Sequence, residues 1–195
     1  MSKKLRVGFD FDGVIAYNPL RVLRKPGNYI MNRILGKGVL DYYPEASHSK
    51  TIWKLLHKTS LFPAPGFTTL KKLLHENKIE GYIITGRYSL LENDLHHWLV
   101  KHNSEHLFKK IYINRNNLNP AIFKESMIEK LKLDHYVEDN WDVVRHLNGK
   151  SDDPKSSIKT DIHWIYNIID HFIPYKNKHP HLSSFLKTII NSNSD

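Results

Sequence analysis

The sequence predicts an α/β protein built around a parallel β-sheet. Two observations support this prediction. Short apolar segments alternate along the chain with longer segments whose apolar residues recur at helical spacing. Polar side chains, several of them acidic, directly follow the apolar segments, and in open parallel sheets ligands bind beyond the carboxyl ends of the strands. The length of 195 residues is enough to bury a sizeable core and fits one domain with an insertion.

The first predicted strand is the run VGFDFDGV at positions 7–14. Side chains alternate along a strand, so the apolar residues can face a core while Asp10 and Asp12 point together to the other side. Carboxylates this close resist joint ionisation unless a cation or a proton holds them. The pair therefore predicts a bound metal, a division into acid and base, or both. Gly13 lets the backbone turn sharply or approach a ligand closely. The alternative is a plain Asp-Gly turn.

Residues 17–64 contain no clear strand, and they are too long and too apolar for a simple connection. Their apolar spacing predicts short helices, interrupted at Pro26-Gly27 and at a Gly-Lys-Gly turn. We expect an insertion with structure of its own, which either closes over a site or packs without touching a substrate.

An amphipathic helix then leads into a second strand, 81–84, which ends in Thr85, Gly86 and Arg87. Strand, helix and strand in this order form a right-handed crossover, so Thr85 is expected beside Asp10. A threonine hydroxyl and backbone amides can bind a phosphate oxygen, Gly86 leaves room, and the fork of Arg87 matches phosphate geometry. Taken alone, the tripeptide can also be a strand-to-helix turn with a capping threonine.

Further elements are expected in alternation: a helix over 89–102, a strand over 110–114, a helix opened by Asn119-Pro120 with Ile122, Ile128 and Leu131 buried, a strand over 162–166 and a helical tail over 167–190. Lys124 lies early in the helix that Asn119-Pro120 opens. Because the start of a helix lies on the carboxyl side of the sheet in an alternating fold, its ammonium can reach the strand ends. For that reason we favour Lys124 over Lys130 and Lys132 as a site residue.

A fourth apolar run leads into the acids Glu138, Asp139 and Asp142. If the strand continues, Glu138 and Asp139 point to opposite sides, so one faces the site and the other a neighbour or solvent. Oxygen ligands with few imidazoles suit a hard cation such as Mg²⁺. The alternative is that Asp139 or Asn140 caps a helix.

These four segments resemble, in order, the four motifs of the haloacid dehalogenase-like hydrolase superfamily, whose members are mostly magnesium-dependent phosphatases. The matching residues are Asp10 with Asp12 in FDFDGV, Thr85 in ITGR, Lys124, and Glu138 with Asp139. The resemblance implies a three-layer Rossmann-like sandwich with a small helical cap inserted after the first strand. The implied division is a catalytic core of residues 1–16 and 65–166, a cap of 17–64 and a C-terminal helical tail of 167–195.

The resemblance also implies roles for these residues. Asp10 corresponds to the nucleophile, and Asp12 to the acid and base. Lys124 is implied as a further catalytic residue that, with Thr85, Gly86 and Arg87, binds the phosphate. Mg²⁺ is expected on Asp10, Asp139 and Asp12, the last through its backbone carbonyl, with Glu138 and Asp142 as further acids. The Glu-Asp pair departs from the Asp-Asp form that is frequent in the family, so the role of Glu138 stays open.

The implied function is hydrolysis of a phosphomonoester through an aspartyl-phosphate. A nucleotide or another small phosphorylated metabolite is the expected substrate, because the acid pair and the short cap are similar to those of nucleotidases. One alternative is a nucleic-acid end-processing 3'-phosphatase, which the Thr-Gly-Arg sequence and the basic charge favour. Another is a non-catalytic binding protein of the same fold, although unused buried acids would cost stability.

Composition narrows the partners. The formal net charge is +9, but the basic residues are scattered, which favours a surface that attracts anionic substrates over a nucleic-acid face. The absence of cysteine excludes disulfides and thiolate metal sites and agrees with a cytoplasmic protein. No apolar stretch is long enough to span a bilayer, so no membrane partner is expected. The 13 histidines lack cysteine partners and are expected at the surface and in the core. Nothing in the pattern indicates an oligomeric state.

Overall fold

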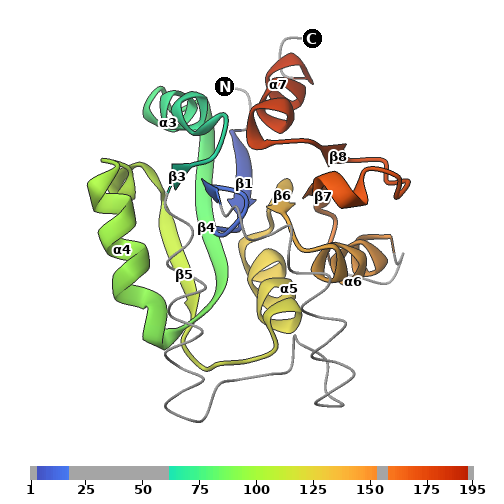
Figure 1. The fold of residues 1–195 in the computed structure, drawn as a ribbon, viewed down its shortest axis with the longest axis horizontal. Helices are drawn as coiled ribbons and strands as arrows, with labels where there is room; N and C mark the ends of the chain where they lie inside the picture. The colour runs from blue at the N-terminus through green and yellow to red at the C-terminus, as the bar shows by residue number, and fades with distance from the viewer. Residues whose placement is uncertain (1–3, 18–61, 153–157, 193–195) are drawn as a thin grey trace.

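The computed structural model of the protein describes residues 4–17, 62–152 and 158–192, and it contains a six-stranded parallel sheet (Figure 1). Side by side, the strands are β5 (Lys110–Asn114), β4 (Ile79–Tyr88), β1 (Leu5–Phe9), β6 (His135–Glu138), β7 (Asp161–Ile165) and β8 (Lys178–His179). The chain runs outwards from β1 to β5 and then continues on the other side of β1 with β6. Ligand sites of open α/β sheets form where the strand order reverses, which here is between β1 and β6.

Helices cover both faces of the sheet. One face carries α3 (Phe67–His75), α4 (Glu92–Lys101) and α7 (Leu182–Ser192), and the other carries α5 (Pro120–Leu131) and α6 (Trp141–Ser151). Single turns of 3-10 helix lie at η3 (Ser89–Leu91), η4 (Glu105–Leu107) and η5 (Ile168–Asp170). The three layers confirm the predicted sandwich.

The central strands are mostly apolar because they are covered on both faces. In β4, Ile83 belongs to the core under α3, α4 and α7, whereas its neighbours Tyr82 and Ile84 belong to the core under α5 and α6. Successive side chains of a strand point to opposite faces, so a strand between two helical layers needs an unbroken apolar run. This arrangement explains why short apolar runs were the strand signal in the sequence.

Two strand ends differ from the prediction. β1 ends at Phe9, so Asp10 and Asp12 lie in a turn after the strand instead of within it. β4 continues through Thr85 to Tyr88, and its pairing with β5 shifts in register between these two residues. The residues between them therefore form a bulge inside a strand, where the sequence predicted a strand end.

The prediction that Ile122 is buried was wrong, since its side chain is 51% exposed. Nine positions separate it from the buried Leu131, about two and a half turns of helix, so the two residues lie on opposite sides of α5. The buried stripe of α5 instead contains Ala121, Lys124 and Ile128.

The predicted helical tail is part of the main body. Residues 178–179 form β8, whose His179 carbonyl accepts a hydrogen bond of 3.0 Å from the Tyr166 amide. In α7, four apolar side chains are buried in the core against α3 and the sheet: Leu182, Phe185, Leu186 and Ile189. The short strand had no signal in the sequence because Lys-His carries no apolar pattern. The tail therefore completes the sheet and one helical layer.

The insertion is described only at its two ends. β2 (Ala16–Tyr17) and β3 (Phe62–Pro63) pair in antiparallel fashion, with Tyr17 opposite Phe62, so the chain leaves the core and returns to it at one place. The predicted cap between them lies outside the described residues. Of the helices in the described ranges, none is long and apolar enough to cross a membrane.

Candidate active site

Three carboxylates meet at the reversal point of the sheet. Asp10 follows β1, and Glu138 and Asp139 stand at the end of the adjacent β6; one oxygen from each lies within 4.8 Å of the others, and all three residues are buried. The two strands are held in register here by a hydrogen bond of 2.9 Å from the Asp10 amide to the Val137 carbonyl. We call these three residues the acidic cluster. It brings together the first and fourth predicted motifs.

Gly13 allows the acidic cluster to form. Its φ of +82° is in the left-handed region, and a Cβ at this position would lie 2.2 Å from Oδ2 of Asp139. The turn is closed by hydrogen bonds from the Gly13 amide to the Ala16 carbonyl, 2.7 Å, and from the Ile15 amide to the Phe11 carbonyl, 3.0 Å. Glycine is thus required both for the backbone conformation and for the approach of Asp139.

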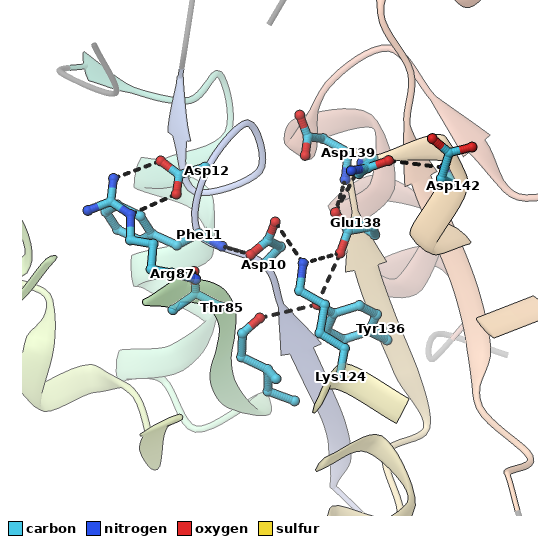
Figure 2. Close-up of polar contacts among 12 residues, drawn as sticks. Asp10, Phe11, Asp12, Thr85, Arg87, Lys124, Tyr136, Glu138, Asp139 and Asp142 are labelled. Atoms are coloured by element: carbon cyan, nitrogen blue, oxygen red, sulfur yellow. Dashed lines mark hydrogen bonds and ion pairs between the residues drawn. The ribbon is translucent and has the colours of Figure 1, made fainter. Parts of the chain in front are cut away.

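Lys124 extends from α5 into the acidic cluster (Figure 2). Its Nζ lies 3.1 Å from Oδ2 of Asp10 and 2.6 Å from Oε2 of Glu138, and the side chain is buried. The helix is aimed by its first residues: Oδ1 of Asn119 accepts from the Ala121 amide at 2.9 Å, and Pro120 occupies the first turn. The predicted choice of Lys124 as the lysine near the strand ends agrees with this position.

The electrostatics of the cluster suit a divalent cation. Burial, and then the charge of Glu138, raises the pKa of Asp10 well above its usual value, although Lys124 acts in the opposite direction. Burial acts to lower the pKa of Lys124, but the charges of Asp10 and Glu138 outweigh it, so the pKa is raised and the ammonium persists. The single ammonium of Lys124 cannot neutralise three carboxylates. Oxygen donors converging on one point fit Mg²⁺.

Glu138 belongs to the acidic cluster and also accepts hydrogen bonds from the turn that follows it. Its Oε1 accepts from the amides of Asp139 and Asn140, at 3.1 and 3.0 Å, while Oε2 accepts from Lys124. Because the strand ends at Glu138 and the chain turns into α6, Glu138 and Asp139 lie together and do not point to opposite sides. Glu138 thus fixes both Lys124 and the turn that carries Asp139.

Thr85 and Gly86 lie on β4, next to β1. The register pairs Ile83 with Phe9, so Thr85 is two residues and Asp10 one residue beyond that pair on neighbouring strands. Thr85 is buried, and its Oγ1 accepts from the Arg87 amide at 3.2 Å. A Cβ at Gly86 would lie 2.9 Å from Cβ of Pro120, so this glycine lets α5 approach the strand.

Arg87 and Asp12 face each other, away from Lys124 (Figure 2). The Nε and Nη2 atoms of Arg87 each lie 2.7 Å from one carboxylate oxygen of Asp12. The carboxylate of Asp12 is therefore paired with Arg87 and is not one of the three carboxylates of the acidic cluster. Phe11, between the two acids, is buried in the same core as Val7 and Phe9, as the predicted alternation requires.

Comparison with known proteins places this fold. No protein-family model and no curated protein matches the sequence. A protein from Thermotoga maritima described as a beta-phosphoglucomutase matches with a TM-score of 0.57 and 14% identity over 96% of this chain and 99% of that chain. A haloacid dehalogenase-like family hydrolase from Streptococcus pneumoniae matches with 0.56 and 12% over 98% and 100%. A protein from Lactobacillus plantarum described as a phosphoglycolate phosphatase matches with 0.53 and 12% over 95% and 99%.

The chain has the fold of the haloacid dehalogenase-like hydrolases. The fold that the resemblance implied is thereby confirmed over the described residues, and the four predicted segments occupy the carboxyl ends of β1, β4 and β6 and the start of α5. At the identities found, the likeness extends to the fold alone.

Asp142 is not brought to the acidic cluster. It lies in the first turn of α6 with its side chain 48% exposed, and its Oδ1 is 3.5 Å from Nη2 of Arg145. Asn140 is the residue that caps this helix, because its Oδ1 accepts from the Asp142 amide at 3.0 Å. The predicted alternative, a helix cap at Asn140, is therefore confirmed, and the acidic cluster is present as well.

Tyr136 supports the site and was not among the predicted residues. Its hydroxyl lies 3.2 Å from the Ile84 carbonyl and 3.3 Å from Oε2 of Glu138, so the ring crosses β1 to link β4 with β6. Burial, and then the charge of Glu138, raises the pKa of Tyr136 well above its usual value, so the hydroxyl donates. The signal was Gly8 within an apolar strand, since a Cβ there would lie 2.8 Å from Cδ2 of Tyr136.

Proposed function

We propose that the protein is a magnesium-dependent phosphomonoester hydrolase that acts through an aspartyl-phosphate on Asp10. The observation that carries the proposal is the buried contact of Asp10 with Lys124 inside the acidic cluster. A nucleophile, a cation for the phosphate and a set of oxygen ligands for a metal meet at this point, beyond the strand ends where ligands of such sheets bind.

The reaction would proceed in two steps. In the first, a carboxylate oxygen of Asp10 attacks phosphorus in line, the bond to the ester oxygen breaks, and Asp12 in its protonated form donates its proton to the leaving oxygen. In the second, Asp12 takes a proton from water, which attacks phosphorus and releases inorganic phosphate from Asp10. The proton that Asp12 loses in the first step is therefore restored in the second, and Asp10 is released as a free carboxylate.

Lys124 and Thr85 would bind the transferring group. The ammonium of Lys124, 3.1 Å from Asp10, would neutralise a phosphoryl oxygen close to the nucleophile, and Thr85 offers its hydroxyl from the neighbouring strand. Asp10 and Asp139, with the backbone carbonyl of Asp12, would hold Mg²⁺, which would reduce the repulsion between the nucleophile and the phosphate dianion. Glu138 would hold Lys124 beside them.

The substrate is proposed as a small phosphorylated metabolite, with a nucleotide monophosphate first. The descriptions of two neighbours as a phosphoglycolate phosphatase and a beta-phosphoglucomutase support phosphate ester chemistry on this fold. A 3'-phosphatase acting on nucleic-acid ends remains the second candidate, because the net charge of +9 favours polyanions.

Phosphate release decides between these candidates. Wild-type protein and Asp10→Asn are assayed with nucleotides, sugar phosphates and 3'-phosphorylated oligonucleotides, with and without Mg²⁺. We expect metal-dependent release that falls at least about a thousandfold in Asp10→Asn, because the nucleophile is lost. Asp161→Asn is the matched control, since Asp161 is 62% exposed at the opposite end of β7. No release from any substrate by folded, magnesium-binding protein would favour a non-catalytic binding protein.

A further inference from the structure

The guanidinium of Arg87 is paired with the carboxylate of Asp12. Its guanidinium makes two parallel contacts of 2.7 Å with the two oxygens of Asp12, and the side chains are only 3% and 9% exposed. Bidentate pairing of this kind sets the rotation of the carboxylate as well as its position. Burial acts to lower the pKa of Arg87, but the charge and hydrogen bonds of Asp12 together with the charges of Asp10 and Asp94 outweigh it, so the pKa is raised and the guanidinium stays charged.

Arg87 lies in the bulge of β4. Thr85 pairs with Ile113 and Tyr88 with Asn114, so two residues of β4, Gly86 and Arg87, are inserted opposite a single step of β5. From this bulge the guanidinium reaches Asp12, in the loop that follows β1.

A third contact holds the guanidinium from its flat face. The ring of Phe11 lies 4.6 Å from Cζ of Arg87, and Phe11 is itself fully buried and packs edge-on against Trp98 at 5.1 Å. A planar group held at its edge by a carboxylate and on its face by a ring has one preferred orientation. Lysine could supply the charge but neither the fork nor the stacking surface.

We propose that Arg87 is a positioning residue for Asp12, which holds the carboxylate in the place from which it transfers protons, and that Arg87 is not a ligand of the substrate phosphate. This role rests on the proposed phosphatase function and replaces the phosphate-binding role that the sequence resemblance implied for Arg87. Asp12 lies in the loop that follows β1, and the two contacts of the fork fix both oxygens of its carboxylate.

The leaving group distinguishes positioning of Asp12 from binding of phosphate. Phenyl phosphate and p-nitrophenyl phosphate have nearly the same shape, but the phenolate leaves much less readily without a proton. Loss of Arg87 should therefore lower kcat more for phenyl phosphate than for p-nitrophenyl phosphate, while a lost phosphate ligand would weaken both esters alike.

The experiment compares wild type, Arg87→Lys, Arg87→Gln, Asp12→Asn and the double variant Asp12→Asn with Arg87→Gln. We expect kcat for phenyl phosphate to fall about 10- to 100-fold in both Arg87 variants, with a several-fold smaller loss for p-nitrophenyl phosphate. The dissociation constant for inorganic phosphate should change less than about threefold, and Arg87→Gln should add little loss when Asp12 is already asparagine. Arg145→Gln, at a 72% exposed surface pair, is the control.

Weaker binding of inorganic phosphate by tenfold or more, with equal losses for both esters and full additivity with Asp12→Asn, would overturn the positioning role. Arg87→Lys guards against a folding defect, because it keeps the charge and is tested by phosphate binding and circular dichroism. Wild-type protein that binds phosphate and magnesium but hydrolyses neither ester would instead overturn the proposed function, and this role with it.

Discussion

Burying the charged side chains of this site costs stability. Asp10 is buried beside two further acids, and its raised pKa measures how poorly the protein alone stabilises its charge. Lys124 offsets part of the cost through two ion pairs. Carboxylates that are buried in this way contribute little to stability as packing elements, and a bound cation would offset their remaining charge.

The substitution Gly13→Ala tests whether the acidic cluster depends on this glycine. The added Cβ would meet Oδ2 of Asp139 at 2.2 Å on a backbone with φ of +82°, so Asp139 must leave the acidic cluster. We expect a loss of about 1–2 kcal/mol in the free energy of unfolding and at least tenfold weaker Mg²⁺ binding, measured by urea unfolding and calorimetry.

Gly149→Ala is the control for that substitution. Gly149 lies in α6, and a Cβ there meets no heavy atom within 4 Å. Alanine should therefore leave Mg²⁺ binding unchanged and raise the free energy of unfolding by up to about 1 kcal/mol. Equal Mg²⁺ affinity in Gly13→Ala and Gly149→Ala would mean that Asp139 does not bind the metal.

Among the elements, α5 depends on its cap for the aim of Lys124. Asn119→Ala removes the hydrogen bonds of 2.9 and 3.4 Å to the amides of Ala121 and Ile122. We expect about 1 kcal/mol less stability in urea unfolding, together with reduced phosphate release, because Lys124 follows one turn later. Asn119→Asp keeps a capping oxygen and should retain both properties; a defect equal to that of alanine would argue against capping as the cause.

The outer strands contain a hydrogen-bonded row of histidines, which we call the histidine ladder: His135, His163 and His179. Nδ1 of His135 lies 3.1 Å from Nε2 of His163, and Nδ1 of His163 lies 3.1 Å from Nε2 of His179. The ladder packs against Phe185 of α7. Burial, and then the neighbouring histidines, lowers the pKa of His163 from 6.5 to about 3, and burial also lowers the pKa values of His135 and His179.

This ladder makes stability fall in acid. Between pH 6.5 and about 3 the unfolded chain binds a proton at His163 that the folded chain refuses, so protons favour unfolding. His163 alone contributes a slope of up to about 1.4 kcal/mol per pH unit between these two pH values, while above pH 6.5 the full stability is present. Asp134 and Asp161 near His135 oppose this effect, and Lys176 near His163 adds to it.

Urea unfolding at pH 7.5 and 5.5 measures the slope. Wild type should lose more stability on acidification than His163→Gln, which keeps a donor and an acceptor but does not titrate. The exposed His171 provides the control, because His171→Gln should leave the slope unchanged. A slope that is the same in wild type and His163→Gln would show that the ladder does not carry the pH dependence.

Across the whole molecule, the chain closes its sheet with its last described elements. α7 buries Phe185 completely against β1 and the histidine ladder. It also contacts the place where the chain returns from the insertion. There the Ser183 amide donates a hydrogen bond of 3.0 Å to the Pro65 carbonyl, and a Cβ at Gly66 would lie 2.4 Å from the Ser183 nitrogen. The tail is therefore part of the cooperative unit that carries the site.

Phe185→Ala should accordingly destabilise the entire fold. We expect a loss of about 3–5 kcal/mol from the lost burial and the cavity left behind, with one cooperative transition followed by both fluorescence and circular dichroism. Phe172→Ala, at a side chain that is 70% exposed, should change stability by less than about 0.5 kcal/mol. A separate early transition in Phe185→Ala would instead indicate that the tail unfolds independently.

Much of the fold and part of the site could be predicted from local patterns. Apolar runs located β1, β4, β5, β6 and β7 because strands covered on both faces must be apolar. The acids after β1 and β6 met as expected, since neighbouring parallel strands end at the same edge. Lys124 followed from the position of Asn119-Pro120, because a helix start lies at that edge.

Only the tertiary structure decided the pairing of these charges. Asp12 pairs with Arg87, which lies in the bulge of β4, and this irregularity has no sequence signal of its own. Glu138 joined Lys124 and Asp139 because the chain turned directly into α6. β8 needed the edge of β7 to exist, as two residues cannot form a strand alone. The sequence by itself determined which residues reach the carboxyl edge of the sheet, since burial and periodicity are local properties. Which of them touch depends on where strands end and bend, which is settled by packing between distant segments.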